Sequence, residues 1–326
     1  MLAPLRDYLY PKDPTLSSLL RVTKECYFNR LSVVIFPGNT GFEEAQWIIS
    51  EDINVEHLLD VFTTADANSP EVWNVCSHFM EHLRWHKRRN VMLGPKIQSL
   101  PDDQPSEPQC LLSLSKLFGS VGNPTECRSA LVHAFAIYRE RGDNSPIAQT
   151  LLYLSEANRQ LDLHAEGTKQ GKEALDIFES LDDKLWQARS WRQLARLLSD
   201  ADRLDSAEEA ASRAIDLLRL LPDKGNEFEL CKCHRILGVI YHAKGMTEKA
   251  VHHLETALRI ASSLNLPEEQ FCIHRRLAEL FFGESRLDDA HAHIEHAKSV
   301  AVNDPYLWVR RWTFRPRFGV MKAGWN

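Results

Sequence analysis

The chain has few cysteines and no long apolar stretch. Its 326 residues include seven cysteines, an odd number without the spacing of a disulfide framework. The first residues lack the charged and then apolar layout of a secretory leader, so we expect a reducing, cytoplasmic setting. The apolar run at residues 31–36 is far shorter than the roughly 20 residues that span a bilayer. These absences predict a soluble protein without a membrane span.

The sequence also lacks recognisable catalytic motifs. It has no phosphate-binding loop, because residues 36–41 contain no lysine and the Gly-Lys of residues 170–173 lies inside a predicted helix. A Gly-x-Ser-x-Gly elbow, a His-Glu-x-x-His pair and a dinucleotide-binding glycine triplet are missing as well. We therefore predict a protein that is not an enzyme and that holds no cofactor. The formal net charge of −6 argues against a chain that coats nucleic acid.

A pattern of leucine followed by a small residue, with an alanine about twenty positions later, recurs five times between residues 109 and 302. The leucine pairs are Leu114-Ser115, Leu154-Ser155, Leu194-Ala195, Leu237-Gly238 and Leu277-Ala278. The alanines are Ala134, Ala174, Ala214, Ala257 and Ala297, spaced 40, 40, 43 and 40 residues apart. A third column keeps the same register through Cys127, Gly167, Ala207, Ala250 and Ala290. Three columns with one set of spacings predict five repeated units.

Each unit is expected to be a helix-turn-helix, because two antiparallel helices lie close only where the side chains at the crossing are small. Helix starts are predicted by Asn123 before Pro124, by Ser145 before Pro146, and by a capping box from Asp205 to Glu208. The turns within the pairs fall at one phase, at residues 121–123, 161–162, 201–202 and 244–245. We predict an all-α fold, a right-handed α-solenoid of about five helix pairs.

The solenoid should be flanked by two other segments. Residues 101–108 are rich in proline and acids and form the clearest boundary. Residues 1–106 are expected to be a separate, mostly helical N-terminal segment, and residues 107–304 the repeats. Residues 305–326 form a divergent basic and aromatic tail, which we interpret as an unfinished repeat.

The fourth unit resembles the tetratricopeptide (TPR) repeat. Leu237-Gly238, Tyr241, Lys244-Gly245, Ala250 and Ala257 stand at the offsets of the TPR consensus. The fifth unit follows it closely, and the first two units follow it loosely. The resemblance implies a scaffold that binds a protein or peptide segment in the concave groove lined by the first helices.

Three further segments, at residues 1–9, 50–59 and 79–86, resemble sequences of a fungal NLR-type family. Its members join a nucleotide-binding switch domain to TPR repeats. Since the phosphate loop is absent here, the resemblance implies a sensor or regulatory half without the ATPase activity of the family. It also implies a possible partner, a nucleotide-binding switch domain supplied elsewhere.

Aligning the five units reveals basic residues on the predicted concave face. Arg192, Arg235 and Arg275 stand three positions before the small residue in units three to five. Three further basic residues lie beside this column, Arg189, Arg196 and Lys232. Such a stripe suits an acidic segment or a C-terminal carboxylate, because arginine pairs bidentately with carboxylates. The alternative is that these side chains pair with Glu279, Asp200 or acids on adjacent helices.

Two alternative functions depend on other residues. His78, His82 and His86 lie on one helical stripe, so a metal-binding protein or metal-dependent hydrolase using His78 and His82 is one alternative. A nucleic-acid-binding helical repeat is the other, with the basic stripe and the tail as its surface. Two further groups contain ligand-type residues: His291, His293, Glu295 and His296, and Cys231, Cys233 and His234. Their spacings spread around a helix, so we favour packing and histidine-rich faces over a metal site.

Overall fold

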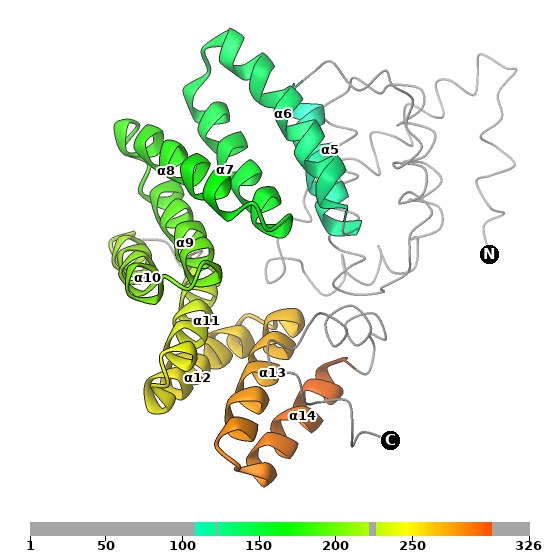
Figure 1. Ribbon diagram of the computed structural model, residues 1–326, viewed down its shortest axis with the longest axis vertical. Helices are drawn as coiled ribbons and strands as arrows, with labels where there is room; N and C mark the ends of the chain where they lie inside the picture. The colour runs from blue at the N-terminus through cyan, green and yellow to red at the C-terminus, as the bar shows by residue number, and fades with distance from the viewer. Residues whose placement is uncertain (1–107, 122, 222–225, 302–326) are drawn as a thin grey trace, which may run out of the picture.

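The computed structural model describes residues 108–121, 123–221 and 226–301. Within these ranges the chain forms ten α-helices and no strand, and consecutive helices pack as antiparallel pairs along a curve (Figure 1). The predicted all-α solenoid of five helix pairs is confirmed. The expected N-terminal segment, the tail and His78, His82 and His86 lie outside the described residues.

Each unit contributes a first and a second helix. The first helices are α5 (Pro108–Val121), α7 (Asn144–Gln160), α9 (Lys184–Asp200), α11 (Glu227–Ala243) and α13 (Pro267–Gly283). The second helices are α6 (Pro124–Arg141), α8 (His164–Ser180), α10 (Leu204–Arg219), α12 (Thr247–Ser263) and α14 (Leu287–Ala301). No helix in the described ranges is long and apolar enough to cross a membrane.

The small residues of the repeat lie where the paired helices cross. The alanine column is buried in all five units, with Ala134, Ala174, Ala214 and Ala257 at 0% exposure and Ala297 at 1%. The five leucines and the small residues that follow them are buried as well. Cys127 is the exception in the third column, because it is only partly buried. The repeated columns therefore mark the contact between the two helices of each unit.

Gly238 shows how close this contact is. A Cβ atom added at Gly238 would lie 2.5 Å from Cγ of Leu254, which belongs to α12. The equivalent atom at Gly167 would lie 3.0 Å from the carbonyl oxygen of Ser155 on α7. Because atoms do not approach to 2.5 Å without displacement, α11 and α12 can pack this closely only if residue 238 has no side chain.

The turns inside four of the pairs use one backbone conformation. Asp162, Asp202, Gly245 and Ser285 have φ angles of 60°, 59°, 72° and 59°. Glycine adopts the left-handed backbone conformation most readily. Aspartate tolerates it, because its short side chain can form a hydrogen bond to nearby backbone. The predicted common phase of the turns at 161–162, 201–202 and 244–245 is therefore confirmed.

The predicted helix caps are only partly right. Asn123 does cap α6, since its Oδ1 accepts a bond of 3.3 Å from the backbone N–H of Glu126. The prediction for Ser145 is wrong, because α7 begins at Asn144 with Asp143 as its N-cap residue. The capping box of Asp205 and Glu208 is wrong too.

In place of a cap, α10 has Arg203 before its first residue, without a side-chain bond. Asp205 and Glu208 both contact the ammonium group of Lys244 in the next unit, and Tyr241 donates a hydrogen bond of 2.7 Å to Glu208. The two acids join neighbouring units because a full positive charge competes for them against the neutral N–H groups of their own helix.

We predict that Gly238→Ala lowers the free energy of unfolding by about 1–3 kcal/mol, because Leu254 or the helix must shift to admit the new methyl group. Gly283→Ala is the matched control at the end of α13, where an added Cβ meets no atom within 4 Å. It should change stability by less than about 1 kcal/mol, in the stabilising direction. Urea unfolding, monitored by circular dichroism, compares the variants. Equal midpoints would show that the contact between α11 and α12 has room for a side chain at residue 238.

Candidate functional site

The candidate site lies on the face formed by the first helices. Contacts run from α7 to α9, from α9 to α11 and from α11 to α13, skipping the helix between. Among the described residues the corresponding contacts between second helices are weaker or absent. In a curved stack, elements on the inner side are the ones that approach each other. The first helices therefore line the inner face, and five of the predicted basic residues are on α9 and α11.

Three of the predicted arginines pair with glutamates of the next first helix. On α9, Arg189 donates through Nε to Oε1 of Glu229 at 3.1 Å, and Nε of Arg192 lies 3.0 Å from Oε2 of the same residue. On α11, Nε of Arg235 donates to Oε2 of Glu269 at 2.8 Å. Both glutamates are buried, with side chains 8% and 11% exposed. Each of these pairs joins one unit to the following one.

Arg196 points in the opposite direction along the stack. Its Nη1 lies 3.1 Å from Oε2 of Glu156 on α7, which also accepts bonds of 2.9 Å from Arg159 and from Gln193. Arg159 in turn donates to Asp200 of α9 at 2.9 Å. Burial alone would raise the pKa of Glu156, but the charges of Arg196 and Arg159 and the bond from Arg159 outweigh it and hold that pKa well below its usual range.

Lys232 and Arg275 have different surroundings. The ammonium group of Lys232 lies 3.6 Å from the centre of the Phe228 ring. Burial lowers the pKa of Lys232 to about 8, and the charge of Arg192 adds to this effect, while Glu229 opposes it. On α13, Nε of Arg275 is 3.8 Å from Oε1 of Glu279, one turn further along the helix.

We call this set of charged side chains the inner-face ladder. Its basic members are Arg159, Arg189, Arg192, Arg196, Lys232, Arg235 and Arg275, and its acidic members are Glu156, Asp200, Glu229, Glu269 and Glu279. Five of the six basic residues that the sequence singles out lie close enough to share acids or to influence one another's charge, and Arg275 lies beside Glu279 of its own helix. Their pairing with acids on adjacent helices, stated above as the alternative, is also present.

Sequence reasoning missed two of these acids although a signal was available. Glu229 and Glu269 both stand nine positions before the small residue of their units, 40 residues apart. The arginines three positions before the small residue in units three and four, Arg192 and Arg235, contact these two glutamates. One more column in the alignment of the units therefore predicts the ion pairs. Glu156 stands one position after the small residue, where unit five has Glu279 and unit three has Arg196. Only the packing of α7 on α9 reveals that Glu156 pairs with Arg196.

The other ligand-type groups do not form a metal site by themselves. Within the described part of the chain no group of three His, Cys, Asp or Glu side chains is arranged to hold a metal ion. Cys231 and Cys233 are both buried, and Cys231 donates to the carbonyl of Ala257 at 3.3 Å. On α14, His291 is exposed while His293 faces His274 of α13. His296 lies near His274 as well, with ring centroids 5.2 Å apart, so two of the α14 histidines share one side of their helix, contrary to the predicted spread.

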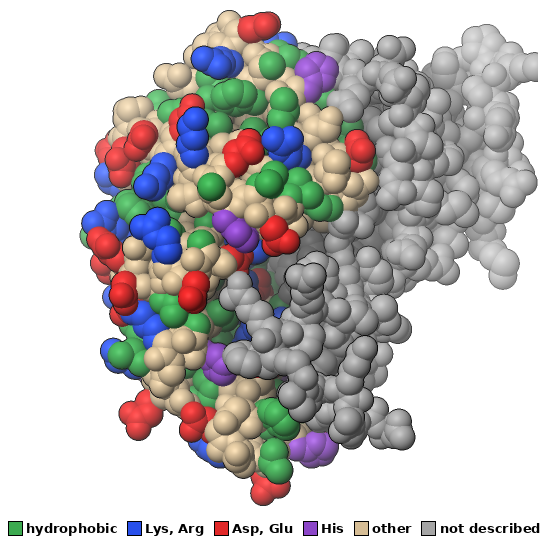
Figure 2. Space-filling model, in the orientation of Figure 1, with side chains coloured by type: hydrophobic (Ala, Val, Ile, Leu, Met, Phe, Trp, Pro, Cys, Tyr) green, Lys and Arg blue, Asp and Glu red, His purple; other side chains and the backbone are tan. Residues whose placement is uncertain are grey.

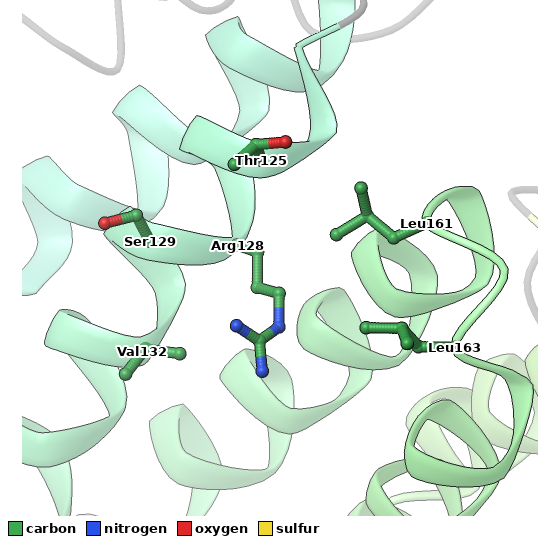
Figure 3. Close-up of a pocket in the computed structure, with 6 residues that line it drawn as sticks. All are labelled: Thr125, Arg128, Ser129, Val132, Leu161 and Leu163. Carbon is green, nitrogen blue, oxygen red and sulfur yellow. The ribbon is translucent and has the colours of Figure 1, made fainter.

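A surface hollow of about 500 Å³ lies away from the ladder, between α6 and the turn that joins α7 to α8 (Figure 3). Arg128 crosses it, and its Nε donates to Oδ1 of buried Asn158 at 2.8 Å. The same guanidinium pairs with Glu166 at 3.3 Å. The remaining lining residues are Thr125, Ser129, Val132, Leu161 and Leu163. Since its one charged side chain is already paired, this hollow offers little chemistry.

The face drawn in Figure 2 mixes Lys and Arg side chains with Asp and Glu side chains over the solenoid. No large area of one charge sign is visible on it. The inner-face ladder is likewise mixed, because each of its arginines has an acid close by. An unbroken basic surface, which the nucleic-acid alternative needs, is not supported by this arrangement.

Comparison with known proteins identifies the repeat. Residues 146–219, which cover most of α7 to α10, match the tetratricopeptide repeat family model. No curated protein sequence matches the chain. Among solved structures, a Rap protein complexed with Competence and Sporulation Factor has a TM-score of 0.61 at 13% identity, over 88% of this chain and 77% of that one.

Two other solved structures are similar. The apo form of RapI has a TM-score of 0.54 at 10% identity and covers 92% of this chain and 95% of its own. TTC0263, a thermophilic TPR protein from Thermus thermophilus, has a TM-score of 0.46 at 22% identity, over 62% of this chain and 96% of that one. The family match and the two Rap structures show that the chain folds as a TPR-type solenoid.

We predict that Glu229→Gln lowers the free energy of unfolding at pH 7 by about 1–3 kcal/mol, because Arg189 and Arg192 lose the carboxylate that both contact. Burial would raise the pKa of Glu229, but Arg192, Lys232 and Arg189 lower it from 4.5 to about 2. A carboxyl whose pKa is lowered by folding stabilises the folded state at every pH above the pKa that the group has in the unfolded chain. The wild type should therefore lose this advantage as the pH falls from about 4.5 to about 2.

The matched control is Glu209→Gln, which removes a carboxylate that pairs with Arg213 at 2.7 Å on the surface of α10, where the two side chains are 65% and 54% exposed. Its effect should stay below about 0.5 kcal/mol. Urea unfolding at a series of pH values gives both differences. Equal effects of the two substitutions, or a difference for Glu229 that is independent of pH, would show that the ladder is a solvated surface.

Proposed function

We propose that this TPR-type solenoid is a non-enzymatic binding protein whose inner groove takes an extended protein or peptide segment with acidic residues. The observation that carries the proposal is the inner-face ladder, in which basic side chains outnumber acidic ones and Glu229 is shared by two arginines. The mechanism is equilibrium binding without turnover. A carboxylate of the ligand would accept further hydrogen bonds from these arginines.

The geometry of the arginines supports a second carboxylate. Arg189, Arg192 and Arg235 contact their glutamates through Nε, at one edge of the guanidinium group. A guanidinium carries five N–H donors in a flat fork, so the same arginine can bind a further acceptor. Lys232 gains most, because burial disfavours its charge and a nearby carboxylate would favour it.

The similar Rap protein supports a binding role for the solenoid. Its solenoid, with a TM-score of 0.61, was solved in complex with Competence and Sporulation Factor. We infer that the present solenoid holds a ligand too, and we place that ligand on the inner face because the ladder lies there. Cys127, Cys231 and Cys233 carry free thiols, which agrees with the cytoplasmic setting expected from the sequence.

We further propose a regulatory role. The resemblance of residues 1–9, 50–59 and 79–86 to fungal NLR-type proteins supports a sensor module that acts on a nucleotide-binding switch domain supplied elsewhere. In that role the acidic segment would be either the signal or part of the switch domain.

Selection from a displayed library of random peptides tests the proposal. The full chain should enrich peptides that carry Asp, Glu or a free C-terminal carboxylate. Lys232→Gln should weaken the binding of a selected peptide about tenfold, because it removes the cation that forms a charge-assisted bond. This substitution is chosen because the ammonium group contacts an aromatic ring, while Glu229 keeps its two arginine partners. Fluorescence anisotropy with a labelled peptide measures the affinity.

Lys172→Gln is the control, since Lys172 is exposed on α8, a second helix. Its affinity should equal that of the wild type, and circular dichroism should show equal helicity in all three chains. Selected peptides without an excess of acidic groups would overturn the acidic ligand. If Lys232→Gln and Lys172→Gln bind the peptide with equal affinity, the inner groove is not its binding site.

A further inference from the structure

Four cations of the inner-face ladder lie together on two neighbouring first helices. Arg192 and Arg196 stand one turn apart on α9, so they share one face of that helix. Lys232 and Arg235 are three positions apart on α11 and share a face in the same way. The two helices contact each other directly, and Arg192 reaches Glu229 on α11. We call these four basic residues the cation cluster.

The acids around the cluster compensate its charge only in part. Arg192 and Arg196 each share their carboxylate with a second arginine of the ladder. Lys232 contacts the ring of Phe228 and forms no ion pair in the part of the chain that the structure describes. The ladder as a whole has seven basic and five acidic members, so its net charge is +2.

The cations of the cluster also act on one another. Burial lowers the pKa of Arg196 to about 10. Burial likewise lowers the pKa of Lys232 to about 8. The charges of Arg192 and Arg235 add to both effects, and nearby carboxylates oppose them without cancelling them. An anion that enters the cluster therefore relieves this repulsion in addition to forming contacts of its own.

Hydrogen-bond donors remain for such an anion. Arg196 contacts Glu156 and Gln193 through Nη1, and its other nitrogens form no hydrogen bond to the described residues. The buried Nε of Arg192 lies 3.0 Å from Oε2 of Glu229, but neither atom has a hydrogen bond of good geometry within the described ranges. The two arginine side chains are 15% and 27% exposed, so a ligand in the groove can reach them.

We propose that the cation cluster binds a phosphate monoester on a serine, threonine or tyrosine side chain of the segment in the inner groove, an inference that rests on the peptide binding proposed above. At neutral pH such a group has a charge of about −1.5 to −2 and three strong acceptor oxygens. Arginine pairs with phosphate through two parallel N–H donors, and lysine adds a point charge.

The net charge of the ladder favours a phosphate over a carboxylate. One carboxylate compensates half of the excess of +2, whereas one phosphate compensates nearly all of it. Two carboxylates would supply the same charge, but on one side of an extended segment they are about 7 Å apart. A phosphate places the whole charge at one point, which suits cations that already act on one another.

Retention of peptide pools on the immobilised full chain tests the inference. Three pools of short peptides share random flanks and differ in a fixed central residue, which is phosphoserine, glutamate or serine. The phosphoserine pool should be retained about tenfold more than the glutamate pool, because a phosphate accepts more charge-assisted hydrogen bonds than a carboxylate. The serine pool should be retained least. Liquid chromatography with mass spectrometry measures the retained fraction of each pool.

Arg196→Gln locates the phosphate. It should lower the retention of the phosphoserine pool about tenfold and reduce the preference for phosphoserine over glutamate, since one cation of the cluster is lost. Glu156 keeps its bonds from Arg159 and Gln193 in this variant. Arg196→Lys should lower retention less, because the charge remains and only the planar fork is lost.

Arg213→Gln is the matched control, since Arg213 pairs with Glu209 on the exposed surface of α10, a second helix. It should retain all three pools as the wild type does, and circular dichroism should show equal helicity in all chains. A variant of Arg196 that retains the phosphoserine pool like this control would overturn the cluster as the phosphate site.

The comparison of pools on the wild type depends on no variant and separates this inference from the proposed function. Equal retention of the phosphoserine and glutamate pools, with the serine pool below both, would overturn the phosphate and leave the acidic ligand. Equal retention of all three pools would overturn both. Inorganic phosphate at the concentration of the peptides should displace little of the phosphoserine pool. Full displacement would mean that the cluster binds a free anion, and would contradict a phosphorylated segment.

Discussion

The close contact between the two helices of each unit is the constraint on which the rest of the structure depends. At this contact the side chains are mostly alanine or serine, and Gly238 cannot carry even a Cβ without displacing Leu254. The contact fixes the distance and rotation of the helices within a unit. Because the same contact is repeated, each unit presents the same positions to the inner face. The alignment of charges from one unit to the next follows from that repetition.

The inner-face ladder joins neighbouring units by ion pairs, in addition to the apolar core that units three to five share. An arginine three positions before the small residue meets a glutamate nine positions before it in the next unit, once at Glu229 and again at Glu269. Buried ion pairs contribute little net stability, since removing both charges from water is costly, but they can specify a register. The same arginines keep donors for a further carboxylate. One set of side chains thus joins neighbouring units and is also the surface that we propose for an acidic ligand.

The units are not equivalent, even though they share one shape. Four positions before the small residue, unit three has Trp191, while units four and five have His234 and His274. Trp191 packs on the core, and Arg213 of α10 lies over its ring. The histidines make a polar contact with the second helix instead. The last two units thus replace an apolar contact by a hydrogen bond between two imidazoles.

The sequence by itself determined the number of units, their period, the small columns and the turns, because each of these reflects contacts between residues close in the chain. It also placed the basic residues on the first helices. It did not reveal that Asp205 and Glu208 pair with Lys244 instead of capping their own helix. Nor did it reveal that Arg196 pairs with Glu156 on the first helix of the preceding unit. The histidine pairs were missed for the same reason. A side chain's partner is chosen among all groups within reach, and only the packing of neighbouring helices decides which groups those are.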